Sequence, residues 1–223
     1  MNTTPLPGHD PVGGADRPWF AYYPPGVAHS VEPPVEASLG EMAHHAADRY
    51  GDRIAFSNLG GTLTFREVDA LATRIAAYLT NELGLSKGDR IVLQMPNLLQ
   101  YPVALYGALR AGLIVVNANP LYTAGELRAV IQDAQPRAIV VLANFAHTLQ
   151  KVLADAPVEH VIITEAGDML PQPKRTIVNL AAKHLKRMVP AYDIPAAIPF
   201  RRLLTGDPAS FVDPGVTHED VAF

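Results

Sequence analysis

Two glycines have a spacing that could build a phosphate-binding loop. Gly107 and Gly112 are separated as the two glycines of a P-loop are, but Leu113 and Ile114 follow where that loop needs lysine and a hydroxyl residue. The sequence also contains no Gly-x-Gly-x-x-Gly turn, the phosphate-binding element of dinucleotide-binding folds. Neither nucleotide-binding fingerprint is therefore predicted.

Histidines and carboxylates are the next candidates, for metal or acid–base chemistry. His44 and His45 are adjacent on an expected helix, so their side chains point in different directions and do not form a two-histidine metal face. The His-Glu-Asp run that begins at His218 is interpreted as a turn capped by Thr217 rather than as a metal site. The chain has no cysteine and no Gly-x-Ser-x-Gly elbow. We therefore assign no catalytic, cofactor-binding or metal-ligating residue.

A basic stretch is the clearest charge feature. Residues 174–202 contain seven Lys or Arg and one acid, Asp193, for a local charge of +6, whereas the remaining 11 basic and 21 acidic residues give −10. Within it, Lys183, Lys186 and Arg187 form a candidate patch for an anionic membrane surface or for a phosphate-rich ligand. A solvated helix face without a partner is the third interpretation, and the sequence leaves all three open.

Composition limits the class of protein. An apolar fraction of 48%, a charged fraction of 18% and a net charge of −4 are typical of a globular protein and give no nucleic-acid footprint. No apolar run is long enough to span a bilayer, and residues 1–14 lack the pattern of a secretory signal. We expect a cytoplasmic protein, with peripheral contact at the inner face of the cell membrane if the basic patch binds lipid, and no nucleic-acid partner.

Helix start and stop signals recur along the chain. Ser38, Thr64 and Thr123 each stand three residues before a glutamate, which is the spacing of a capping box. These signals predict a helix that begins at Ser38 and stops at Gly51, one from Thr64 to about Leu83 that stops at Gly84, and one from Thr123 that ends before Pro136. A further helix is expected over 98–110. An amphipathic helix is predicted over 177–189, with Ile177, Leu180, Ala181, Leu185 and Met188 on one side.

Short β-rich runs lie between the helices. They cover residues 54–57, 62–63, 90–95, 113–117, 138–142 and 160–164. The first two flank Leu59-Gly60-Gly61 and predict a hairpin, while the other four are continuous apolar runs that alternate with helices. The fold class is therefore α/β, a largely parallel sheet flanked by helices on both faces.

Three parts are expected along the chain. Residues 1–35, rich in proline and glycine, predict an extended leader; residues 36–170 form the α/β subdomain; residues 171–223 hold the basic helix, a proline-rich connection and the start of a further subdomain. Val221-Ala222-Phe223 resembles the first half of a buried strand. We therefore expect the chain to be a truncated piece of a longer protein.

Several of these segments resemble a known family. Residues 63–68 and 72–76 (LTFREV, ATRIA) resemble the first core motif of the adenylate-forming superfamily, and residues 93–97 and 110–123 resemble its next stretch. Residues 186–195 (KRMVPAYDIP) and 219–223 (EDVAF) are similar to bacterial long-chain fatty-acid–CoA ligases. The resemblance covers the chain from about Trp19 onward.

The resemblance implies a fold and an activity. The fold is the flavodoxin-like N-terminal subdomain of the adenylate-forming enzymes. The activity is conversion of a fatty acid, ATP and coenzyme A to acyl-CoA, AMP and pyrophosphate through an acyl-adenylate, with Mg²⁺. The family's phosphate loop and its catalytic lysine match no segment of this sequence, so we expect the chain alone to be inactive and to bind none of these ligands tightly. Fatty acid and coenzyme A would be partners of the parent enzyme, and the basic patch could face coenzyme A.

An interpretation of another class remains beside it. The chain could be a self-sufficient flavodoxin-like binding or membrane-surface module without catalysis. If instead it is a truncated lobe, its exposed sheet edge and apolar face would favour self-association.

Overall fold

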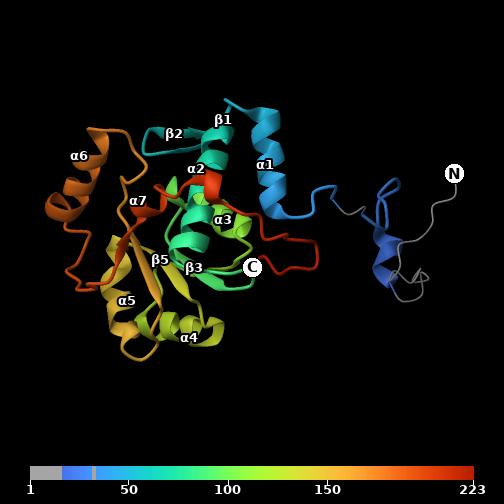
Figure 1. Ribbon diagram of the computed structural model, residues 1–223. Coiled ribbons are helices and arrows are strands. Elements are labelled where there is room, and N and C mark those ends of the chain that lie inside the picture. Colours follow the sequence, from blue (N-terminus) through green and yellow to red (C-terminus); the bar gives the residue numbers. More distant parts are fainter. Residues whose placement is uncertain (1–16, 32–33) are drawn as a thin grey trace. The chain divides into compact units, whose positions relative to one another are not determined.

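A five-stranded sheet in which every neighbouring pair is parallel forms the centre of residues 36–223 (Figure 1). Its order is β4-β3-β5-β6-β7, the order 2-1-3-4-5 of flavodoxin-like sheets. The strands are β3 (Arg90–Gln94), β4 (Ile114–Asn117), β5 (Ala138–Leu142), β6 (His160–Thr164) and β7 (Ile198–Pro199). The expected parallel α/β fold is confirmed.

Both faces of the sheet are buried because successive strand side chains point to opposite faces. Ile91, Leu93 and Val140 pack into one apolar cluster, whereas Val92 and Ile139 pack into another. The first cluster also contains residues of α2 (Phe65–Ala77) and α3 (Gln100–Arg110), and the second contains residues of α4 (Ala124–Ala134) and α5 (Ala146–Leu153). The continuous apolar runs of the sequence are therefore strands that two helical layers cover.

The predicted capping residues begin their helices as expected. In α1 (Leu39–Tyr50) the Ser38 side chain accepts a hydrogen bond from the Glu41 N–H. Thr64 and Thr123 form complete capping boxes at α2 and α4. After Ala77 the helix continues as a π-helical turn, η2 (Tyr78–Glu82), and ends before Gly84, whose φ is 62°.

The predicted hairpin is also present. β1 (Ile54–Asn58) and β2 (Gly61–Thr64) are antiparallel, with Asn58 opposite Gly61. The two residues between them, Leu59 and Gly60, have φ values of 49° and 66°. Positive φ at both central positions is the property of a type I′ turn, which matches the twist of the two strands.

The structure differs from the sequence predictions in two helices. α5 was not predicted, because it follows a short 3-10 turn and its N-cap, Phe145, offers no side-chain acceptor. The helix expected over 177–189 begins earlier, as α6 (Lys174–Leu180), and continues as a π-helical turn, η4 (Ala181–Leu185). Its shift follows from Pro173, which stands at the N-cap and marks the start of the helix. A short helix, α7 (Phe200–Leu203), follows β7 directly.

The last three residues do not form the buried strand that their sequence predicts. The carbonyl of Ala222 accepts a hydrogen bond from the N–H of Val115, beside β4, but Val221 and Phe223 are 60% and 59% exposed. The segment lies along the edge of the sheet through this one backbone bond and is not covered by another layer of the described residues.

The computed structural model describes residues 17–31 and 34–223. The chain divides into two units, 1–35 and 36–223. In the first unit, Pro18–Tyr22 forms a 3-10 helix and the ring of Phe20 stacks on His29, with 4.2 Å between the ring centres. The rest of the expected leader, residues 1–16 and 32–33, lies outside the described residues, and the three-part division remains a prediction.

Candidate functional site

The carboxyl ends of β3 and β5 form the point of the sheet where ligands most often bind in open α/β folds. The chain leaves β3 for β4 on one side and later returns to β5 on the other, so strand order reverses between β3 and β5. The loops that follow these two strands diverge, and a crevice outside the carboxyl ends is the usual ligand position. Polar residues at these strand ends are therefore candidates for function.

Gln94, the last residue of β3, is completely buried. Its Nε2 lies 3.4 Å from the carbonyl oxygen of Asn119, whereas its Oε1 has no hydrogen-bond partner among the described residues. A buried amide oxygen without a partner is unusual in a folded protein. Gln94 is thus a polar group held at the switch point by the apolar strand that precedes it.

A hydrogen-bonded network closes the carboxyl end of β6. Gln100 Nε2 donates to Thr164 Oγ1 at 3.2 Å and to the Glu165 carbonyl at 2.7 Å. Thr164 Oγ1 and the Glu165 N–H both donate to Asp168 Oδ2, at 3.0 and 2.8 Å. Because Gln100, Thr164 and Asp168 are buried and mutually satisfied, the network fixes this loop rather than presenting a free acid or base.

The segment 186–195 crosses the same edge. Asn144 Nδ2 donates to the Met188 carbonyl at 3.0 Å, and the Asp193 N–H donates to Gln150 Oε1 at 2.8 Å. Burial, with a smaller contribution from the charge of Glu165, raises the pKa of the Tyr192 hydroxyl. These contacts place the segment over the ends of β5 and β6 and close to the switch point.

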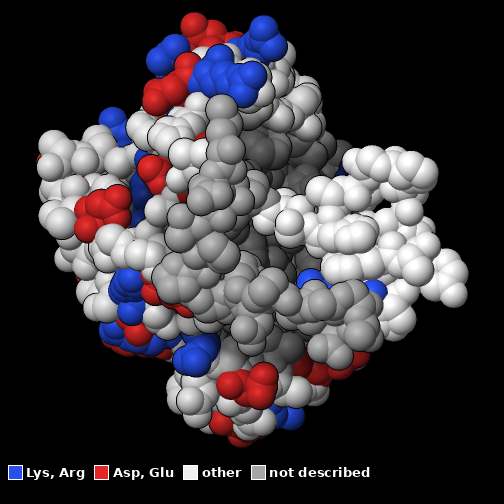
Figure 2. Space-filling view, turned by 90° about the vertical axis from the view of Figure 1, so that its right-hand side faces the viewer, with Lys and Arg blue, Asp and Glu red and all other residues white. Residues whose placement is uncertain are grey.

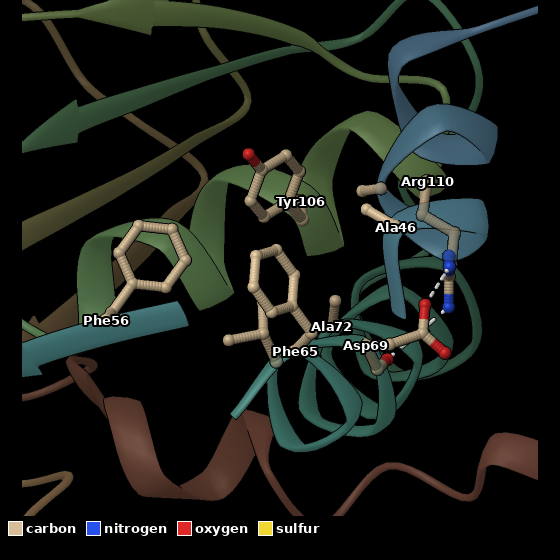
Figure 3. A pocket seen from close by; sticks show the side chains of 9 residues that line it. Ala46, Phe56, Phe65, Asp69, Ala72, Tyr106 and Arg110 are labelled. Atoms are coloured by element: carbon tan, nitrogen blue, oxygen red, sulfur yellow. Dashed lines mark hydrogen bonds and ion pairs between the residues drawn. The ribbon is translucent and has the colours of Figure 1, made fainter. Parts of the chain in front are cut away.

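A small apolar pocket lies between α1, β1, α2 and α3 (Figure 3). The rings of Phe56, Phe65 and Tyr106 converge on it, and Asp69 and Arg110 stand at its other end. Arg110 forms an ion pair with Asp69 and also donates to the Asp69 carbonyl and to Thr73 Oγ1. The pocket therefore has an apolar lining, but its cation is already neutralised and is not available to a carboxylate ligand.

A wider groove lies between α1 and residues 211–216 and is lined in part by His44, His45 and Glu41. His44 Nδ1 lies 3.2 Å from Asp69 Oδ2, the carboxylate that also pairs with Arg110, and His45 Nδ1 lies 3.3 Å from Glu36 Oε1. Within residues 17–31 and 34–223, no group of three histidines or carboxylates could hold a metal ion.

The three residues of the predicted basic patch lie on one exposed turn. Lys183 is in η4, Lys186 is its C-cap, and Arg187 follows in the left-handed region with a φ of 48°. All three are exposed, and none forms an ion pair within 4.0 Å with another described residue.

Comparison with known proteins identifies the family of this chain. The model of the AMP-binding enzyme family matches residues 43–214. The chain belongs to this family. The matched region begins in α1 and includes the whole sheet, so the family match and the fold agree over the same residues.

Relatives of this chain include bacterial ligases. It is 50% identical over 206 residues to the long-chain-fatty-acid–CoA ligase of Salmonella typhimurium, which covers 92% of this chain and 37% of the relative. It is 36% identical over 169 residues to the enzyme of that name from Bacillus subtilis, covering 76% and 30%. The chain thus spans roughly a third of the length of these relatives.

Solved structures show the same fold. A putative long-chain-fatty-acid CoA ligase from Rhodopseudomonas palustris superimposes with a TM-score of 0.64 at 20% identity, covering 83% of this chain and 40% of that one. The anthranilate CoA ligase AuaEII gives a TM-score of 0.67 at 16% identity, covering 85% and 32%. At this identity the likeness establishes the fold alone.

Sequence reasoning missed the polar groups at the strand ends of this chain. Gln94 and Thr164 each end an apolar run, Ile91-Val92-Leu93 and Val161-Ile162-Ile163. The sequence could have indicated them, because a polar residue in the last position of a buried strand needs a hydrogen-bond partner or a ligand. No sequence pattern predicted the pocket of Figure 3, because its lining residues come from four separate elements.

Proposed function

We propose that the chain is the N-terminal portion of an ATP-dependent long-chain fatty-acid–CoA ligase. The observation that supports this most directly is 50% identity over 206 residues to the Salmonella typhimurium ligase. The flavodoxin-like sheet and the match of the AMP-binding model over 43–214 are consistent with it. A self-sufficient module without catalysis is not favoured, because the relatives that match nearly the whole of this chain are ligases.

The proposed reaction has two steps. The fatty-acid carboxylate attacks the α-phosphate of ATP to give acyl-adenylate and pyrophosphate, and the thiol of coenzyme A then displaces AMP. Mg²⁺ would neutralise phosphate charge in the first step. Among the described residues, no cluster of three or more His, Asp or Glu side chains is arranged to hold a metal ion.

The part of this chain in that reaction is structural. It provides a sheet with two buried faces and a fixed carboxyl edge, on which the catalytic parts of the enzyme would be assembled. We expect the chain alone to release no pyrophosphate, because its buried polar groups at β6 are satisfied by one another and the cation of the apolar pocket is paired.

The partners of the parent enzyme would be a fatty acid and coenzyme A, in the cytoplasm and in peripheral contact with the inner face of the cell membrane. No helix among the described residues is long and apolar enough to cross a membrane. The exposed edge of β4, with Val221 and Phe223 uncovered beside it, favours self-association of the chain alone. Light scattering that shows only monomer at high concentration would contradict self-association.

A chimera tests the proposed function. This chain would replace the matching region of the Salmonella typhimurium ligase, and acyl-CoA formation from palmitate, ATP and coenzyme A would be measured. We expect the chimera to form acyl-CoA and the chain alone to release no pyrophosphate. A chimera that unfolds cooperatively, as a folded protein does, but forms no acyl-CoA would contradict the proposal, and so would pyrophosphate release by the chain alone.

A further inference from the structure

The helical segment 174–188 presents apolar side chains to solvent. Ile177, Leu180, Leu185 and Met188 are 61%, 53%, 80% and 53% exposed, and no residue of α6 or η4 is buried. The sequence places these four on one side of a helix, where an apolar stripe normally faces the core. Here the stripe has no covering layer among the described residues, and α6 lies at the periphery of the molecule (Figure 1).

The segment is nevertheless held firmly on its other side. Asn179 Nδ2 donates to Glu165 Oε2 at 2.8 Å, and Asn179 Oδ1 accepts from the Gly167 N–H at 2.7 Å. At its end, the Met188 carbonyl accepts from Asn144 Nδ2 at 3.0 Å. The helix is therefore attached to the β6 and β5 loops in a defined orientation, so its exposed stripe is a fixed surface.

The same segment carries uncompensated positive charge. Residues 174–188 contain five basic residues and no acid. None of these five forms an ion pair within 4.0 Å with a described residue. By contrast, acidic and basic side chains lie beside one another on the face of the molecule that Figure 2 shows.

We propose that segment 174–188 binds the surface of an anionic lipid bilayer, with Ile177, Leu180, Leu185 and Met188 entering the interface and Lys183, Lys186 and Arg187 contacting lipid phosphates. Exposed apolar side chains interleaved with Lys and Arg are the composition of interfacial helices. A free phosphate-rich ligand would account for the cations but not for four exposed apolar side chains, since such ligands bind in concave sites. This inference rests on the membrane contact proposed for the parent enzyme and names the residues that make it. Vesicle binding can be measured without ligase activity.

Vesicle binding by the whole chain tests this surface. Vesicles of phosphatidylcholine with phosphatidylglycerol are compared with phosphatidylcholine alone, by co-sedimentation at about 0.1 M and about 1 M salt. Binding to the anionic vesicles that weakens at high salt is expected. Absence of binding to anionic vesicles, or equal binding to both compositions, would overturn the proposal.

Two variants and a matched control locate the contact. K183Q/K186Q/R187Q should weaken binding about 100-fold at low salt, from about fivefold for each cation near the lipid surface. L180S/L185S should weaken it about tenfold at both salt concentrations, because the apolar contribution is not screened. R49Q/R53Q/K151Q removes the same charge from exposed positions outside the segment and should bind as the unchanged chain does.

Other occupants of the surface would give other results. Equal loss of binding in the control and in K183Q/K186Q/R187Q would show that only net charge matters and would overturn the assignment to this segment. Binding of free coenzyme A that is lost only in K183Q/K186Q/R187Q, with no vesicle binding, would assign the cations to that ligand instead. Thermal unfolding of every variant checks that each is folded.

Discussion

Helices α2 and α6 share a sequence pattern but differ in how far their apolar side is buried. Each carries an apolar stripe, and each continues into a π-helical turn, η2 or η4. In α2 the stripe is buried, with Ile75 1% exposed, whereas Ile177 of α6 is 61% exposed. Periodicity therefore predicts a helix and its apolar side, but it does not tell what covers that side.

The two helices also differ in how they begin. The first N–H groups of α2 are all bonded: Phe65 to the carbonyl of Arg53, Arg66 to that of Gly51, and Glu67 to the Thr64 side chain. The N-cap of α6 is Pro173, which gives no side-chain hydrogen bond. α2 is thus fixed at its start by a side-chain cap and two backbone bonds, whereas α6 has a backbone bond from the Arg175 N–H to the Pro171 carbonyl and is attached further along by Asn179.

Replacing one isoleucine in each helix by alanine should give the largest difference in stability between α2 and α6. Ile75→Ala removes a fully buried side chain and should lower the free energy of unfolding by about 2–5 kcal/mol. Ile177→Ala should change it by no more than about 0.5 kcal/mol, since its side chain is already largely in water. Urea unfolding of both variants measures the difference, and equal losses would show that α6 is buried in solution.

A glycine substitution tests the close packing of α2 on α3. A Cβ added at Gly107 would lie 2.6 Å from Ile75 Cγ2 and 3.1 Å from the Ala72 carbonyl oxygen. Gly107→Ala should therefore destabilise the protein by about 1–3 kcal/mol. The control is Gly125→Ala in α4, where only Thr123 Oγ1 is near, at 4.0 Å. That change should stabilise by about 0.5–1 kcal/mol, and a stable Gly107→Ala variant would contradict the tight contact.

Loss of the α2 cap should have a smaller effect. Thr64→Ala removes the acceptor for the Glu67 N–H and should cost about 1 kcal/mol in the free energy of unfolding. Thr64→Ser keeps the hydroxyl and serves as the control, with most of the stability retained. If chemical denaturation shows the same loss for both, the hydroxyl is not the stabilising group.

The smallest expected effect is a pH dependence at the equivalent cap of α4. The N–H of Thr123, and then its hydroxyl, hold the pKa of Glu126 below its ordinary value of 4.5. A carboxylate whose pKa is lower in the folded state stabilises the protein above that ordinary value, and this stabilisation is lost as the pH falls through the folded pKa. Glu126→Gln should therefore flatten the fall of Tm below about pH 4.5, and an unchanged pH profile would contradict this. The first turn of α6 carries no acid, so no such dependence arises there.

Local signals in the sequence predict much of this fold. The bounds of β5 and β6 are those of the apolar runs at 138–142 and 160–164, and the threonine caps begin α2 and α4. α5 was missed because it has neither a capping side chain nor a stopping glycine. β7 was missed because two residues in a proline-rich segment carry no strand pattern, and only their pairing with β6 identifies them.

The candidate site was less predictable than the fold. Three basic residues were named from charge alone, and the structure places them on one exposed turn without showing what they bind. The Gln100–Thr164–Asp168 network joins residues that are 64 and 4 positions apart in the chain. Such groups are brought together by strand order, and strand order is a property of the whole sheet rather than of any local pattern.

Thr64 belongs to two elements at once, because it is the last residue of β2 and the N-cap of α2. No linker separates the hairpin from the helix. One residue inserted at this junction would turn the helix by about 100° relative to the hairpin and would carry Ile75 away from Gly107. Changes of length among homologous proteins should therefore fall at the Leu59-Gly60 turn, where the two strands can lengthen together, and avoid the junction at Thr64.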